Sequence, residues 1–158
     1  MSLAAYQLLV NDRNRADSAS PKDVRYVLNW CGLGEQRTEK VVHSYVSSRS
    51  FTGDYLDAYA IKISHVEVSE LTQQSNHFGR RWYRCDQLPP VLNDALTFVA
   101  GWFHGDEIPW FPDQAQLRSS EFYVYPWTIF YHGLHPTAAE LIFIRPSDNM
   151  IFFIGSKT

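Results

Sequence analysis

The chain has 158 residues, of which 45% are hydrophobic and 20% are charged, and its formal net charge is −3. This composition excludes an intrinsically disordered chain, and the length is sufficient for one self-supporting hydrophobic core. The negative charge disfavours binding to nucleic acid or to an anionic membrane through the whole domain. We therefore expect one globular domain over residues 1–158, in which residues 1–19 form a loosely ordered N-terminal segment.

The cysteine content and the hydropathy pattern indicate in which cellular compartment we expect the protein and which bound groups we expect it to lack. Cys31 and Cys85 are the only cysteines, too few for a disulfide framework or a cysteine-rich zinc site. The first ten residues lack the basic leader of a secretory signal, and no stretch of sequence reaches the ~18 apolar residues that a membrane span needs. We expect a cytoplasmic protein that carries no cofactor and no metal.

The first element in chain order is a helix that begins near Ser20. Ser20 suits the N-cap, Pro21 suits the first helical position, and Asp23 suits the positive end of the helix dipole. Apolar residues then recur at helical spacing on one face, and two glycines end the element. These residues are Val24, Val27, Leu28 and Cys31, followed by Gly32 and Gly34.

The segment 39–48 fits two kinds of element. Its apolar residues recur at helical spacing, yet their β-branched side chains also suit a strand. They are Val41, Val42, Tyr45 and Val46. We favour a second N-terminal helix at this position.

The middle of the chain predicts short elements. Residues 59–64 alternate between apolar and polar side chains, which indicates a strand, with a bulge near His65 where the alternation changes phase. Residues 70–79 are polar and end in a glycine, so we expect a loop there. Residues 80–85 then form a short strand.

The second half begins with a helix over residues 91–103, whose apolar residues leave only a thin polar face, so we expect it to be buried. From Glu121 onward the runs 122–131, 140–145 and 150–154 are typical of strands, and 146–149 suits a tight turn. Pro126 lies inside the first run and indicates an edge strand or a break.

Helices first and a meander last predict an α+β fold. In this arrangement the N-terminal helices and the buried central helix pack on a mostly antiparallel sheet, which ends in a C-terminal three-strand meander. A curved sheet under a helix can also leave a pocket, so a small-molecule enzyme or carrier is an alternative function.

The loop 102–112 is the first candidate site. Its aromatic rings, if all exposed, would form an apolar patch that monomeric proteins rarely carry without a use for it. The opposing interpretation is that the rings fold back beneath the sheet as anchors. If exposed, they predict a non-catalytic binding module that engages a protein partner or another copy of the chain. The candidate residues are Trp102, Phe103, His104, Asp106, Glu107, Trp110 and Phe111.

Evidence for catalysis or metal binding is sparse. His104, Asp106 and Glu107 are chemically capable of acid–base work, but adjacent carboxylates on a loop are commonly solvent-facing charges. His132 and His135 stand three residues apart without a nearby cysteine or carboxylate, which predicts a turn rather than a metal site. The sequence contains no phosphate-binding glycine loop, dinucleotide fingerprint, zinc-protease motif or nucleophile elbow.

The run 77–84 is the remaining candidate site, because arginines alternate in it with aromatic residues. Arginine supplies paired donors for a phosphate, and aromatic rings supply surfaces on which a base can stack. Arg80, Arg81 and Arg84 therefore predict anion or nucleic-acid binding as a second alternative function. The opposing interpretation is that they pair with neighbouring acids such as Asp86.

Overall fold

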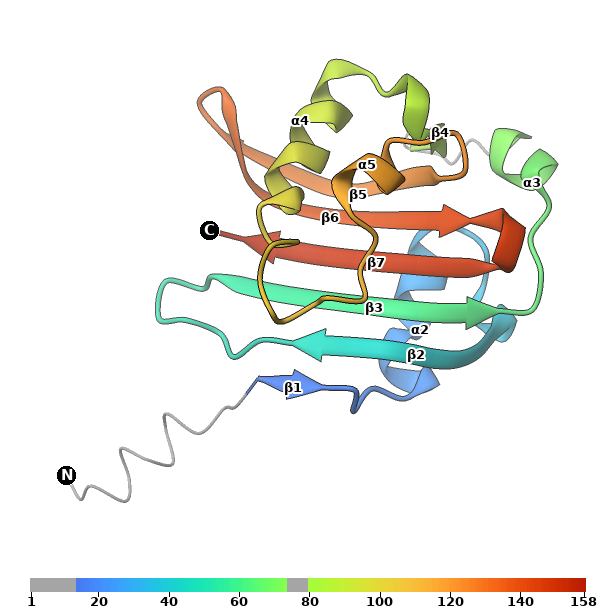
Figure 1. The fold of residues 1–158 in the computed structure, drawn as a ribbon, viewed down its shortest axis with the longest axis horizontal. Helices are drawn as coiled ribbons and strands as arrows, with labels where there is room; N and C mark the ends of the chain where they lie inside the picture. The colour runs from blue at the N-terminus through green and yellow to red at the C-terminus, as the bar shows by residue number, and fades with distance from the viewer. Residues whose placement is uncertain (1–13, 74–79) are drawn as a thin grey trace.

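The computed structural model describes residues 14–73 and 80–158, and these form one antiparallel seven-stranded sheet with helices on both faces (Figure 1). The predicted α+β class is confirmed. The strands, in the order in which they lie across the sheet, are β1 (Arg15–Ala16), β2 (Thr38–Val46), β3 (Tyr55–Ile63), β7 (Met150–Lys157), β6 (His135–Arg145), β5 (Tyr123–His132) and β4 (Tyr83–Arg84). The helices are α2 (Pro21–Trp30), α3 (Val68–Gln73), α4 (Pro90–Ala100) and α5 (Gln114–Leu117).

Helix α2 begins where its sequence predicts. The Ser20 backbone N–H donates to Asp23 Oδ2 at 2.7 Å, and the Ser20 hydroxyl donates to the same oxygen at 2.7 Å. These hydrogen bonds stabilise the carboxylate and hold the pKa of Asp23 below its usual value. The apolar face of the helix is fully buried against the sheet through Val24, Val27 and Leu28.

The helix favoured at 39–48 is wrong, because this segment is strand β2. It pairs antiparallel with β3, placing Tyr45 opposite Ala58 and Val46 opposite Asp57. Spacing alone could not separate the two interpretations, since four apolar residues fit either period. The decision comes from long-range pairing with β3 on one side and β1 on the other, where β-branched residues fit well.

Three elements in the middle of the chain have other bounds than the sequence predicts. Strand β3 begins at Tyr55 and ends at Ile63, and the register irregularities lie in its partner β2 rather than near His65. Residues 70–73, predicted as loop, belong to α3, while 74–79 lie outside the described residues. The predicted strand at 80–85 shortens to β4, whose two residues pair with β5.

The N-terminal segment is partly described. Of the residues predicted as loosely ordered, 1–13 lie outside the described part of the chain. Further along, β1 pairs with β2, the Asp17 backbone N–H donates to the Ser44 carbonyl at 2.8 Å, and the Ala19 N–H donates to the Ser44 hydroxyl at 3.1 Å. This end of the described chain is therefore joined to the edge of the sheet.

The C-terminal meander is confirmed, and its last strand lies next to the N-terminal half of the sheet. Strand β7 lies between β6 and β3, so it joins the two halves of the sheet. The turn before β7 ends at Asn149, whose φ of 54° places it in the left-handed region. Pro126 lies beyond the two residues of β5 that pair with β4, so the outer side of β5 is a sheet edge at this position. A register shift in the pairing of β5 with β6 also falls between Pro126 and Thr128.

Each face of the sheet has its own hydrophobic core. Figure 1 shows α4 and α5 on the near face and α2 on the far face. Helix α4 buries Leu92, Leu96 and Val99 against the near face, as its sequence predicts. On the far face, α2 packs over alternate residues of the central strands, including Ile61 and Phe153. Burial of each such side chain contributes about 1.5–3 kcal/mol, so both faces are needed for stability.

Candidate functional site

The rings of the loop 102–112 face the protein rather than solvent. The loop crosses the near face of the sheet between α4 and α5 (Figure 1). Phe111 is 6% exposed, and its ring contacts those of Phe143 and Phe152, with centroids 6.4 and 5.8 Å away. Phe103 stacks on Phe111 at 5.1 Å. These rings anchor the loop on β6 and β7, beside α4 and within the same hydrophobic core.

The rest of the loop divides between anchors and exposed polar groups. Trp110 is partly buried and stacks on His43 of β2 at 5.2 Å, and Trp102 packs against the same core. In contrast, the polar side chains of the loop are exposed, namely His104, Asp106 and Glu107. Within the described residues, none of the three forms a hydrogen bond or an ion pair through its side chain. A partner that docked on this loop would therefore meet these polar side chains rather than all four rings.

The two histidines of the β5–β6 hairpin lie at its exposed turn. His132 and His135 pair across the turn, and both are exposed. Gly133 has a φ of 62°, as the first central residue of a type II′ turn requires. Among the described residues, no three His, Cys, Asp or Glu side chains gather as they would around a metal.

Carboxylates and tyrosines also gather on the far face, but each carboxylate there has partners. Arg49 holds Asp57 with two hydrogen bonds of 2.8 and 2.6 Å, and Thr128 donates to Glu140 at 2.9 Å. Burial is the main reason why the pKa of Tyr26 lies well above its usual value, and the neighbouring Tyr59 raises it further. This phenol therefore stays neutral. The Tyr55 hydroxyl of β3 also donates to Glu140 at 3.5 Å, so the network links strands β3, β5 and β6.

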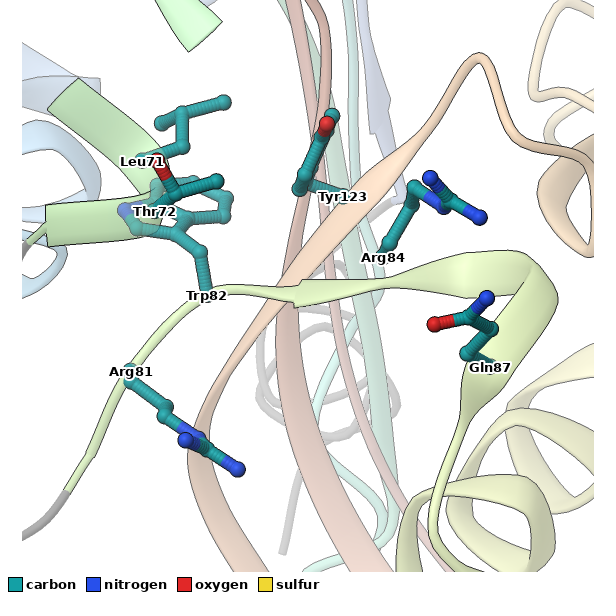
Figure 2. A pocket seen from close by; sticks show the side chains of 7 residues that line it. All are labelled: Leu71, Thr72, Arg81, Trp82, Arg84, Gln87 and Tyr123. Carbon is teal, nitrogen blue, oxygen red and sulfur yellow. The ribbon is translucent and has the colours of Figure 1, made fainter. Parts of the chain in front are cut away.

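A pocket of about 290 Å³ lies beside β4, where α3 approaches the outer end of the sheet. Figure 2 shows its lining side chains. They come from α3, from the segment around β4, from the 3₁₀ turn Cys85–Gln87 and from β5. The lining residues are Leu71, Thr72, Arg81, Trp82, Arg84, Gln87 and Tyr123.

Trp82 forms the apolar wall of this pocket. It is 5% exposed, its ring lies 5.4 Å from that of Tyr125, and Figure 2 shows it next to Leu71 and Thr72. Its indole Nε1 is buried and has no hydrogen-bond partner among the described residues. An unpaired buried donor costs about 1–3 kcal/mol, so the packing around the indole must offset that penalty.

Two of the three candidate arginines line the pocket, each with its own neighbour. Arg84 binds the carboxylate of Asp86 through Nε at 2.6 Å and Nη2 at 3.0 Å. This pair raises the pKa of Arg84 and lowers that of Asp86. Arg81 is exposed, and its guanidinium lies 4.8 Å from the centre of the Tyr83 ring.

Arg80 belongs to a different part of the molecule. Its guanidinium lies 4.3 Å from the centre of the Trp127 ring, and Trp127 stacks on Trp30 of α2 at 4.7 Å. The structure therefore separates Arg80 from Arg81 and Arg84, and residues 77–79 of the predicted run lie outside the described residues.

The polar lining of the pocket is rich in donors. Arginine, glutamine, threonine and tyrosine side chains all donate hydrogen bonds, and neither Asp nor Glu is among the lining residues. Arg81 and Arg84 stood out in the sequence, whereas Leu71, Thr72, Gln87 and Tyr123 did not. The spacing of Val68 and Leu71 on one helical face was the available signal for α3, but Leu71 lay inside 70–79, which was interpreted as a loop.

Comparison with known proteins gave no match for this chain among family models, curated proteins or solved structures. In the described residues, no helix has both the length and the apolar character needed to cross a membrane. The longest described helix, α4, has 11 residues.

Proposed function

We propose that this protein is a binding module that takes a small phosphate-bearing ligand in the pocket beside β4. The observation that carries the proposal is the lining of the pocket, in which each polar side chain can donate and none is a carboxylate. Guanidinium groups match the geometry of phosphate oxygens, which accept several donors at once. The volume of about 290 Å³ lies near the lower end for ligand pockets, which favours a small ligand or a single phosphorylated side chain.

The two arginines would contribute unequally. Asp86 occupies Nε and Nη2 of Arg84, which leaves Nη1 and the second hydrogen of Nη2 for a ligand. The Asp86 carboxylate also offsets part of the positive charge. Arg81 has no carboxylate contact within the described residues, so it supplies the larger share of the attraction.

Titration with inorganic phosphate and with phenyl phosphate, at low and at high salt, tests the proposal. Calorimetry and tryptophan fluorescence detect the binding. We expect saturable binding that weakens as salt rises, because exposed charges are screened. The double substitution Arg81→Gln and Arg84→Gln should weaken binding about tenfold or more, the equivalent of about 1.4 kcal/mol. Lys22→Gln combined with Arg25→Gln, both on the exposed side of α2, is the matched control that removes two positive charges elsewhere.

Asp86→Asn gives a test of opposite sign. It releases Arg84 from its ion pair and removes a negative charge beside the pocket, so phosphate should bind several-fold more tightly. Phenylacetate is the carboxylate counterpart of phenyl phosphate, and it should bind more weakly than phenyl phosphate if the pocket takes a phosphate. The proposal fails if neither phosphate probe binds, or if the double arginine variant binds them as well as the unchanged protein does.

A further inference from the structure

A second hollow lies at the opposite end of the sheet, between helix α4 and the tip of the β5–β6 hairpin. Figure 1 shows the turn of this hairpin at the upper left, beside α4. The groove has a volume of about 430 Å³. Its lining residues are Asp94, Thr97, Phe98, Leu134, His135 and Pro136.

The apolar side chains around this groove are unusually open to solvent. Leu134 is 87% exposed at the second central position of the turn, where polar residues are common. Tyr131 and Val91 are also exposed, and the Tyr131 hydroxyl donates to the Val91 carbonyl at 3.4 Å. This contact links the hairpin, near its tip, to the start of α4 beside the groove.

The hairpin also lacks the charges that usually protect an exposed sheet edge. No Asp, Glu, Lys or Arg occurs from residue 122 to 139, although one residue in five of the whole chain is charged. Beyond Val124, β5 has no strand on its outer side among the described residues. Natural edge strands commonly carry lysine or other charges that prevent association.

We propose that a second copy of this chain docks on the hairpin tip, related to the first by a twofold axis. The groove and the side chain that would fill it are adjacent on one hairpin, so a twofold axis at the tip places each Leu134 in the partner's groove. Asp94 on one wall then faces the partner's His135, and the reverse contact occurs at the same time. The uncharged hairpins approach without like-charge repulsion, despite a net charge of −3 on each copy.

The area of the contact sets the expected affinity. Stable interfaces bury about 800 Å² on each partner, and a hairpin tip with one helix turn falls near or below that size. We therefore expect a dimer that dissociates on dilution in the micromolar range. The groove lies at the opposite end of the sheet from the pocket beside β4, so this proposal stands independently of the proposed function.

Sedimentation velocity over roughly 1–100 µM protein tests the dimer. The unchanged chain should sediment increasingly as a dimer, whereas Leu134→Glu should remain monomeric with an unchanged melting temperature. Phe51→Glu is the matched control, because Phe51 is a fully exposed aromatic residue in the β2–β3 turn. A monomer at all concentrations, a dimer that survives Leu134→Glu, or a dimer that Phe51→Glu abolishes would each overturn the proposal.

A charge exchange tests the twofold geometry. Asp94→His and His135→Asp should each weaken self-association several-fold, because like groups then meet across the interface. A mixture of the two variants restores both opposite pairs, so it should dimerise more strongly than either variant alone. If mixing gives no gain, Asp94 does not face the partner's His135, and the proposed arrangement is wrong.

Discussion

The loop 102–112 and the β5–β6 hairpin tip are both apolar segments between regular elements, yet they present their side chains in opposite directions. The loop carries four aromatic rings, and its Phe111 is buried between strands of the near face. The hairpin tip carries only Phe130 and Tyr131, but Leu134 and Phe130 are open to solvent. Composition alone marks the loop as the binding surface, whereas the structure leaves the apolar groups of the hairpin uncovered.

The difference follows from what lies beneath each segment. Helix α4 covers only part of the near face, and the loop supplies rings for the remainder, so its apolar content serves a core. The hairpin tip is met only at its side by α4, and among the described residues Leu134 and Phe130 stay open to solvent. An apolar loop therefore has to be judged by the area that it must cover, as well as by its residues.

Phe111→Ala should produce the largest effect. Removing a buried phenylalanine loses its transfer free energy and leaves a cavity, so the free energy of unfolding should fall by about 3–5 kcal/mol. Chemical denaturation followed by circular dichroism measures this change. A loss below about 1 kcal/mol would mean that the loop detaches easily and that its rings are available to a partner after all.

Trp110→Ala should have a smaller effect, because this ring is only partly buried. It loses its stacking on His43 and part of its contact with the core, which should cost about 1–3 kcal/mol. The same denaturation experiment applies, and His43→Ala should remove part of the same contact. If the double variant loses as much free energy of unfolding as the two single variants lose in sum, the stacking of the two rings contributes nothing to stability.

The pH dependence of stability tests whether the near-face core is dry. Burial raises the pKa of the Cys85 thiol to about 12, while an unfolded cysteine ionises near 8.5. The folded state therefore binds the proton more tightly, and this thiol should lower stability as pH rises above about 8.5, by about 1–2 kcal/mol at pH 10. Burial also raises the pKa of the Cys31 thiol to about 12, so Cys31 adds a decline of its own on the far face. Cys85→Ala should therefore make the decline shallower without abolishing it, and an unchanged slope would indicate that water reaches the Cys85 thiol.

Leu134→Ser should have the smallest effect on folding. The side chain is almost fully exposed in the monomer, so unfolding of dilute protein should change by less than about 0.5 kcal/mol. Differential scanning calorimetry at low concentration is the appropriate measurement. A clear destabilisation would place Leu134 in an intramolecular contact and remove the contrast with the loop.

The sequence was most informative where local chemistry is sufficient. Helix α2 was predictable because Ser20, Pro21 and Asp23 act within one turn, and α4 because its apolar residues surround the helix. Strand β2 was not predictable, since its identity depends on pairing with residues 55–63. The position of β7 between β3 and β6 also depends on contacts across most of the chain.

The candidate site was predictable only in part, for the same reason. Arg81 and Arg84 are close in sequence and stood out by composition. Tyr123 and Thr72 reach the pocket only because β4 pairs with β5 and α3 packs beside Trp82. The burial of the rings in 102–112 was one of two open interpretations, and only the area left uncovered by α4 distinguishes them.

The central position of β7 also constrains how the chain can fold. Strands β2 and β3 form one hairpin and β5 and β6 another, and β7 follows all of them in chain order. Until β7 is in place, the inner edges of both hairpins remain unpaired and their apolar faces incomplete. Pairing of β7 with β3 and β6 therefore joins the two hairpins and closes both edges together.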